Sequence, residues 1–246
     1  MLRLPGPICA ETLGRDWINS GTLARTRSWA PGERTPALLT ALARRPHLSS
    51  VEQELIHALE TAGISDRSEQ AMFLAQMAHE TQGFTKLRED LRYSAQRLLD
   101  VFPKRFKDRD DADRTVKGGT DAIAERIYGG RADLGNAEEG DGARYIGRGY
   151  VQLTGRANYA AAGAALGIDL VSKPALAEQS ECAARIAVWF WKRDARLGVR
   201  ARAGDVPGVT RIINGALIGL ADRQRRFEHY SFVLRTKRAA ARRLKP

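Results

Sequence analysis

Two glutamates nine positions apart, Glu80 and Glu89, are the side chains best suited to acid and base chemistry. Glu80 closes the apolar helical segment AQMAHE, shortly before the helix-breaking Gly83. Apolar helix surface around a carboxyl raises its pKa, and a helix end opens it to a cleft, as a general acid requires. Glu89 follows in the irregular stretch KLREDLRYS, where a loop can fold back with room for a water. The spacing therefore predicts a pair of catalytic carboxyls.

Several local alternatives compete with this interpretation. A single Glu after a His on a helix is more often a surface or capping residue than a catalyst. The pair is also no zinc-protease signature, because HExxH requires a second His and position 83 is Gly. Cys9 and Cys182 form no CxxC pair and no Cys/His cluster, so we expect no metal site and no disulfide. Cys182 is expected to be a buried free thiol.

A second polar segment, GRGYVQLTGRANY over residues 147–159, is too glycine-rich for a helix start and too polar for a core strand. Gln152 and Thr154 alternate there with Val151 and Leu153, which predicts a short extended piece lining a cleft. Amide and hydroxyl groups on such a wall match the donors and acceptors of sugars. An ordinary polar turn is the alternative for this segment.

The elements that position these residues are predicted to be helices, because apolar residues recur almost everywhere at helical spacing. Ser49 with Glu52, and Asp66 with Glu69, make capping-box patterns before two apolar runs, and Gly63 ends the first of them. The fold class is therefore all-α. Further helices are expected over 94–102, 120–128, from Gly155 to Gly167, 180–195, 205–213 and from 221 onward, with Trp189, Phe190 and Trp191 in the core.

The chain is predicted to have two parts. Residues 1–46 are rich in Gly, Pro, Thr and Arg and are treated as an extension of uncertain order. Residues 47–246 form the catalytic domain. Within it, the Asp-, Gly- and Arg-rich region 104–145 is expected to make an excursion or small lobe beside the main helical body.

The net charge of +11 is concentrated at the two ends of the chain. Residues 1–46 carry +4, residues 231–246 carry +6, and the middle carries only +1, which argues against a nucleic-acid groove. The basic C-terminal segment is expected to continue the last helix and to steer the protein to an anionic envelope; plain solubility is the alternative. No signal peptide or membrane span is recognisable, which predicts synthesis in a bacterial cytoplasm and release to the wall by another protein.

On five ordered segments the chain resembles glycoside hydrolase family 19, meaning plant-type chitinases and above all phage and bacterial endolysins within the lysozyme-like superfamily. The resemblance implies a two-lobed helical fold and hydrolysis of β-1,4 bonds between N-acetylated sugars without a cofactor. The matching segments are AQMAHETQGF, EDLRYSA, GNAEEGDGARYIGRGYVQLTGRANY, ECAARIAVWFW and TRIINGALIGLADR.

The resemblance also implies roles for individual residues. Glu80 falls on the general acid of the family's HE motif, and Glu89 on the residue that activates water. Thr154 falls on a hydroxyl that helps to hold the attacking water. The family's remaining substrate-binding positions, with the Arg that follows them, fall on Gln152, Asn158, Asn214 and Arg223.

The departures from the family pattern are small. Ala216 stands where a second Gly is usual after Gly215, and its methyl is expected to narrow the approach to the backbone there. Phe84, in Thr-Gln-Gly-Phe, favours the endolysin branch, and the cysteines of the plant enzymes are absent.

The combined prediction is a monomeric endolysin that cuts peptidoglycan by inversion, with carboxyls roughly 6.5–9.5 Å apart. A chitinase with the same residues, a catalytically silent wall-binding module and a basic nucleic-acid binder are the alternatives. The sequence leaves open the bond that is cut and whether the protein serves phage lysis, is a prophage remnant or acts as a secreted effector.

Overall fold

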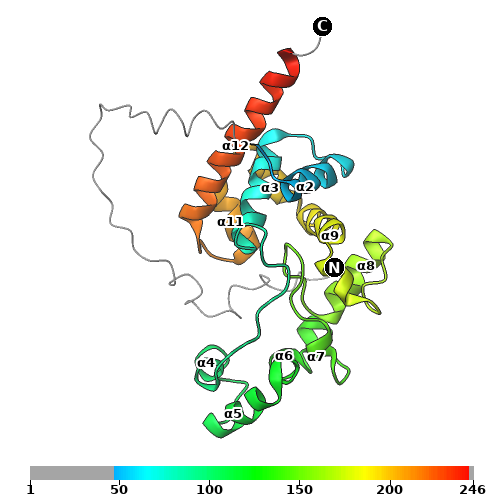
Figure 1. The fold of residues 1–246 in the computed structure, drawn as a ribbon, viewed down its shortest axis with the longest axis vertical. Coiled ribbons are helices and arrows are strands. Elements are labelled where there is room, and N and C mark those ends of the chain that lie inside the picture. Colours follow the sequence, from blue (N-terminus) through cyan, green and yellow to red (C-terminus); the bar gives the residue numbers. More distant parts are fainter. Residues whose placement is uncertain (1–46, 244–246) are drawn as a thin grey trace, which may run out of the picture.

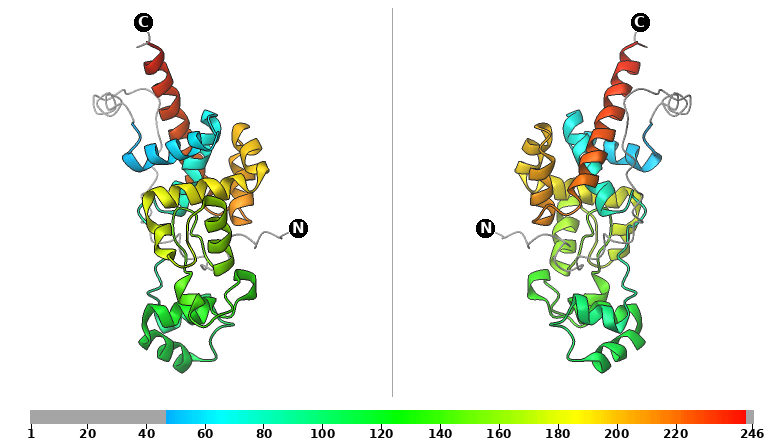
Figure 2. Two further views of the ribbon diagram at one scale, coloured as in Figure 1. Left: turned by 90° about the vertical axis from the view of Figure 1, so that its right-hand side faces the viewer. Right: turned by 90° about the vertical axis from the view of Figure 1, so that its left-hand side faces the viewer.

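The computed structural model describes the backbone of residues 47–243 and the side chains of residues 47–236. Within these residues the chain is helical, with only isolated β-bridges near Arg148, and the all-α prediction is confirmed. Two bodies of helices are separated in space (Figure 1), and α12 projects from the larger one (Figure 2). The extension 1–46, with Cys9, lies outside the described residues, as do residues 244–246.

The larger lobe contains most of the core. Its helices are α2 (Ser50–Thr61), α3 (Arg67–Glu80), α8 (Arg156–Leu166), η3 (Pro174–Glu178), α9 (Ser180–Lys192), α10 (Ala195–Arg202), α11 (Val206–Asn214) and α12 (Leu220–Arg243).

The smaller lobe has a hydrophobic cluster of its own, built from residues 91–146. Most of its members come from the segment expected to form a small lobe, but Leu91, Ala95, Leu98 and Phe102 precede that segment and Ile146 follows it. Its helices are α4 (Ala95–Val101), α5 (Arg109–Lys117), α6 (Gly119–Tyr128), η2 (Ala132–Leu134) and α7 (Asp141–Arg144).

Local capping sets the ends of the helices. The capping box at the start of α2 is confirmed: Ser49 Oγ accepts from the Glu52 N–H, and a Glu52 carboxylate oxygen accepts from the Ser49 N–H at 2.7 Å. α8 begins after Gly155 and ends at Gly167, whose φ of +67° places it in the left-handed region that favours glycine. The C-terminal segment continues α12 to Arg243, as expected.

The prediction of a second capping box, at Asp66 and Glu69, is wrong in one respect. Asp66 caps α3 by accepting from the Glu69 N–H at 2.9 Å, but the Glu69 side chain does not reach back to Asp66. It turns into the core, where it accepts from the Trp191 indole N–H at 3.1 Å and from Arg202 at 2.6 Å. The indole needs an acceptor once it is buried, and α9 and α10 bring both donors to this carboxylate.

The core is organised around α3, which is buried along most of its length and packs along α12. Trp191 meets Phe73 of α3 edge to face, with ring centroids 5.4 Å apart. Trp189 and Phe190 are only partly buried, so the expectation that all three aromatic residues enter the core is wrong for these two. Because α9 packs against α2, α8, η3 and α10 with one side, only part of the aromatic run can reach the interior.

Cys182 is a buried free thiol on α9, which confirms the expectation for it. Among the described helices, none is long and apolar enough to cross a bilayer.

The buried environment of Glu69 yields a stability prediction. Glu69→Ala removes the acceptor of a buried indole, so the free energy of unfolding should fall by about 2–3 kcal/mol. Arg202 is half-exposed and returns to water, which limits the loss. Urea denaturation followed by tryptophan fluorescence measures the change, with Glu60→Ala on exposed α2 surface as control. A loss no larger than that of the control contradicts the role assigned to Glu69.

Candidate active site

Glu80 is the last residue of α3, at the point where the helix gives way to a tight turn. Thr81 fixes this turn, since its hydroxyl donates to the Met77 carbonyl at 2.7 Å and accepts from the Phe84 N–H at 2.9 Å. Phe84 itself has a φ of +66°, a conformation that bulky residues rarely adopt. Its ring packs edge to face on Tyr150 at 5.8 Å, which ties the turn after Glu80 to the segment containing Gln152. Such strain is held only where surrounding contacts enforce it.

A buried arginine holds the Glu80 carboxylate. The Arg223 side chain is only 2% exposed, and its Nη2 lies 2.5 Å from Glu80 Oε1. Its Nη1 donates to Gln76 Oε1 at 2.5 Å, and its Nε donates to the Ile218 carbonyl at 3.2 Å. The expectation that Glu80 is surrounded by apolar helix surface is therefore wrong. The polar side of α3, through Gln76, binds the guanidinium that contacts this carboxylate.

Asn214 supports the loop that follows α11. Its Oδ1 accepts from the Ala216 N–H at 2.9 Å, and its Nδ2 donates to the Ile218 carbonyl at 3.2 Å. The Ile218 carbonyl is thus shared between Asn214 and Arg223, which links this loop to Glu80. Contact of Asn214 with substrate stays a prediction.

The Glu89 carboxylate accepts hydrogen bonds from two other segments of the chain, one at Gly147 and one at the end of α6. The Gly147 N–H donates to its Oε1 at 2.6 Å, and the Tyr128 hydroxyl of α6 donates to its Oε2 at 2.8 Å. The Glu89 N–H in turn donates to the Gly147 carbonyl at 3.0 Å. Burial raises the pKa of Glu89, and the hydrogen bonds from Gly147 and Tyr128 offset this only in part. A base with a raised pKa accepts a proton more readily, which suits the role expected for Glu89.

The segment containing Gln152 is a tight turn, not the extended piece that the alternation suggested. Arg148 and Leu153 exchange both backbone hydrogen bonds, at 3.2 and 2.8 Å, so the chain reverses between them. Gln152 has a φ of +49°, and its N–H donates to the Gly149 carbonyl at 3.1 Å. The alternative of a polar turn was therefore the correct description of the backbone, and Val151 and Leu153 are buried in it.

The turn nevertheless brings three of the predicted residues to one point. A methyl group at Gly147 would lie 3.1 Å from Gln152 Oε1, 3.3 Å from Thr154 Oγ1 and 3.4 Å from Glu89 Cδ. A carboxylate, a hydroxyl and an amide thus face each other across a residue without a side chain. Such a group can hold and orient one water. Any side chain at position 147 would crowd these groups.

Asn158 stabilises the turn that carries Gln152 and Thr154. Its side chain is 6% exposed, and its Nδ2 donates to the Thr154 carbonyl at 2.7 Å. The Thr154 hydroxyl donates to the Gln152 carbonyl at 2.8 Å. Asn158 therefore fixes the backbone of the water-facing residues, and its contact with substrate stays a prediction.

Two groups at the site were missed by the sequence analysis. Tyr128, the partner of Glu89, lies 39 positions away from it at the end of α6, where nothing local marks it. His79 pairs with Asp222 at 2.8 Å, directly beside the pair of Glu80 and Arg223. Burial lowers the pKa of His79, more than the hydrogen bond to Asp222 raises it. The dipeptides His79-Glu80 and Asp222-Arg223 thus make two adjacent bridges between α3 and α12.

Within residues 47–236, no group of three or more His, Cys, Asp or Glu side chains is placed to hold a metal ion.

Comparison with known proteins identifies the family. The family described as "Chitinase class I" matches residues 56–201, which include both glutamates, Gln152, Thr154 and Asn158. A glycosyl hydrolase family 19 domain-containing protein of Haemophilus influenzae is 38% identical over 179 residues, which cover 72% of this chain and 86% of that protein. The chain belongs to glycoside hydrolase family 19. It is therefore a glycoside hydrolase.

Two chitinases are similar to part of the chain or to its fold. Chitinase 8 of Oryza sativa is 35% identical over 119 residues, covering 41% of this chain and 46% of that protein. The solved structure of chitinase C from Streptomyces griseus is 23% identical and has a TM-score of 0.50, covering 77% of this chain and 88% of that one. This second likeness concerns the helical fold alone.

The hydrogen bond between Tyr128 and Glu89 yields a prediction about pH. Tyr128→Phe removes a donor that favours the ionised carboxylate, so the pKa of Glu89 should rise further. Because a base must be ionised to accept a proton, activity falls as the pH drops through this pKa, and the acidic limb of the kcat/KM profile should move to higher pH. Tyr145→Phe, whose hydroxyl donates to the Val171 carbonyl, is the control. An unchanged acidic limb rules out Glu89 as the titrating base.

Proposed function

We propose that the chain is an endolysin that hydrolyses the β-1,4 glycosidic bonds of bacterial peptidoglycan in a single displacement with inversion. The observation that carries the proposal is the meeting of Glu89, Thr154 and Gln152 around Gly147. One water in this group would attack the anomeric carbon while Glu89 takes its proton. The hydroxyl of Thr154 would orient the water, and the amide of Gln152 would hold either the water or a sugar acetamido group.

Glu80 would protonate the leaving oxygen. As its proton leaves, the carboxylate that forms lies against Arg223, which stabilises the developing negative charge. The buried guanidinium also fixes the direction of the carboxyl group, since its other nitrogens are bound by Gln76 and Ile218. Acid and base are thus held by separate frameworks, and single displacement needs room for one water between them.

The charge of the chain supports peptidoglycan over chitin. Chitin is a neutral polymer, whereas peptidoglycan carries carboxylates on its peptides, and a net charge of +11 attracts the second. The segment EDLRYSA, with its endolysin-like pattern, points the same way. The proposal includes synthesis in a bacterial cytoplasm, release to the wall by another protein, and steering to the anionic envelope by the basic C-terminal segment.

Chitin is the second candidate substrate, and the family description and the rice relative favour it. Digestion of purified peptidoglycan and of colloidal chitin by the full chain decides between them. We expect faster release of fragments from peptidoglycan, with mass spectrometry identifying the new reducing-end sugar. Proton NMR early in turnover should detect the α-anomer first. Chitin as the faster substrate overturns the peptidoglycan proposal, and a β-anomer as first product overturns the single displacement.

The acid and base roles predict the effects of three substitutions. Glu80→Gln and Glu89→Gln keep the shape of the side chains but remove proton transfer, so kcat should fall by about 10²–10⁴-fold. Thr154→Val should cost less, because the hydroxyl orients the water while the carboxylate accepts its proton. Turbidity clearance of cell walls measures the rates, and Glu228→Gln on the exposed side of α12 is the matched control. A Glu80→Gln variant that keeps a third of the wild-type rate refutes the assignment of the acid.

A further inference from the structure

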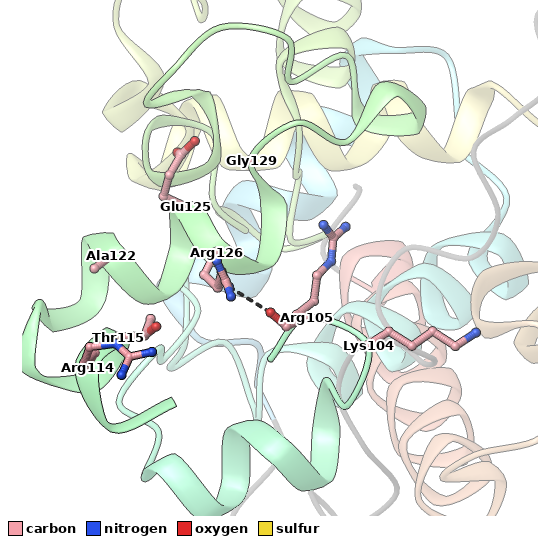
Figure 3. A pocket seen from close by; sticks show the side chains of 8 residues that line it. All are labelled: Lys104, Arg105, Arg114, Thr115, Ala122, Glu125, Arg126 and Gly129. Atoms are coloured by element: carbon pink, nitrogen blue, oxygen red, sulfur yellow. Dashed lines mark hydrogen bonds between the residues drawn. The ribbon is translucent and has the colours of Figure 1, made fainter. Parts of the chain in front are cut away.

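An open pocket of about 720 Å³ lies in the smaller lobe, between the chain after α4 and helices α5 and α6. None of the residues singled out by the sequence lines it. Its size falls in the range of about 300–1,000 Å³ that is typical of ligand sites. Figure 3 shows the side chains that line it: Lys104, Arg105, Arg114, Thr115, Ala122, Glu125, Arg126 and Gly129.

The lining is more basic than the segment from which it comes. Residues 104–133 contain eight Lys or Arg and seven Asp or Glu, so the segment as a whole is nearly neutral. The pocket, in contrast, collects four cations and a single carboxylate. Positive and negative side chains are interspersed along the segment, but the fold brings mainly the positive ones to the pocket.

Apart from Asp111, which contacts Arg114 and Arg126, several acids of this segment are bound outside the pocket. Asp108 caps α5, Asp113 pairs with Arg109 at 3.0 Å and Asp133 pairs with Arg131 at 2.5 Å. Glu125 lines the pocket, but its Oε2 accepts from the Ala143 N–H at 3.1 Å, and in Figure 3 its carboxylate points away from Arg126. These contacts leave the cations of the pocket short of negative charge.

Two of the four cations have a protein partner. Arg126 donates to Asp111 at 2.5 Å, and Arg114 lies 3.6 Å from the same carboxylate. For Lys104 and Arg105, no side-chain hydrogen bond or ion pair is present within residues 47–236. Arg105 is half-buried and acts only through space on Asp133, whose pKa is lowered first by its hydrogen bond from Arg131. A half-buried guanidinium that makes no hydrogen bond to an anion is suited to binding one.

We infer that this pocket binds the carboxylates of an acidic peptide, namely the peptide stem that peptidoglycan strands carry. The inference rests on the proposed function, because chitin, the other candidate substrate, carries neither peptides nor carboxylates. Guanidinium groups bind carboxylates with two parallel hydrogen bonds, and Lys104 adds a second point of charge. The pocket is large enough for several residues of an extended peptide. A single ion would leave most of the pocket empty.

Helix α6 connects this pocket to the site of hydrolysis. Glu125 and Arg126 line the pocket, and Tyr128, two positions further, donates its hydroxyl to Glu89. A peptide stem held by Arg105 and Lys104 therefore anchors its glycan strand to the helix that supports the catalytic base. The pocket would act as a positioning subsite that favours peptide-bearing strands over bare ones.

The test compares Lys104→Gln/Arg105→Gln with Lys107→Gln/Lys117→Gln. Both double variants remove two positive charges from the smaller lobe, but Lys107 and Lys117 are exposed and do not line the pocket. Peptidoglycan fragments with intact stems, and the same strands stripped of peptide by an amidase, serve as substrates. For the pocket variant we expect KM on the intact fragments to rise by about fivefold, the effect of one or two weakened ion pairs, with KM on the stripped strands unchanged. The other double variant should match the wild type on both.

Two further measurements distinguish a failure of the pocket inference from a failure of the proposed function. Binding of a synthetic stem peptide to the full chain, followed by NMR, should weaken in the pocket variant and recover in Lys104→Arg/Arg105→Lys. If the wild type cuts peptidoglycan but the pocket variant keeps its KM and its peptide affinity, the pocket inference is overturned and the proposed function stands. If the wild type cuts neither glycan, the proposed function is overturned, and saturable peptide binding that depends on Arg105 still supports the pocket.

Discussion

A buried guanidinium constrains the architecture of the larger lobe. Arg223 has only 2% of its side chain exposed, and a charge removed from water is stable only when its donors are paired. Its partners come from two places, Gln76 and Glu80 on α3 and the Ile218 carbonyl in the loop before α12. The packing of α12 along α3 is therefore set by directional bonds as well as by apolar contact. The catalytic carboxyl of Glu80 is one of the acceptors that this constraint requires, so stability and position of the acid have the same origin.

The carboxyl of Glu89 is fixed by different contacts. Its two oxygens are held by the Gly147 N–H and the Tyr128 hydroxyl, and Tyr128 belongs to the cluster of the smaller lobe. The separation of Glu80 and Glu89 thus depends on how the smaller lobe packs against the chain segments that lead into it. A movement of that lobe changes the position of the base and leaves the acid in place. This division explains why the residues around Glu89 come from three separate stretches of sequence.

The features that could be predicted from the sequence are those set by interactions between residues close together in the chain. Caps such as Ser49, and glycines such as Gly167 whose φ is positive, mark helix ends correctly, and the apolar period identifies the all-α fold. Helices α5 and α10 were not predicted, because six of the nine residues of α5 are charged and α10 contains an internal glycine. Tertiary contacts stabilise both helices. Glu69 and Tyr128 were missed for a related reason: their partners lie 122 and 39 positions away. A pattern within a few residues carries no information about such contacts.

The one departure from the family pattern in the loop after α11 is explained by the backbone. Gly215 and Gly219 both have a φ of +71°, and a side chain at Gly219 would collide with the His79 ring, so glycine is required at both positions. Ala216 is exposed, and its N–H is bound by Asn214 Oδ1, so a methyl group there points into solvent without disturbing the turn. The positions of this loop that require glycine are therefore Gly215, beside Asn214, and Gly219, beside His79. The substitution at position 216 leaves the support of Arg223 and Glu80 intact.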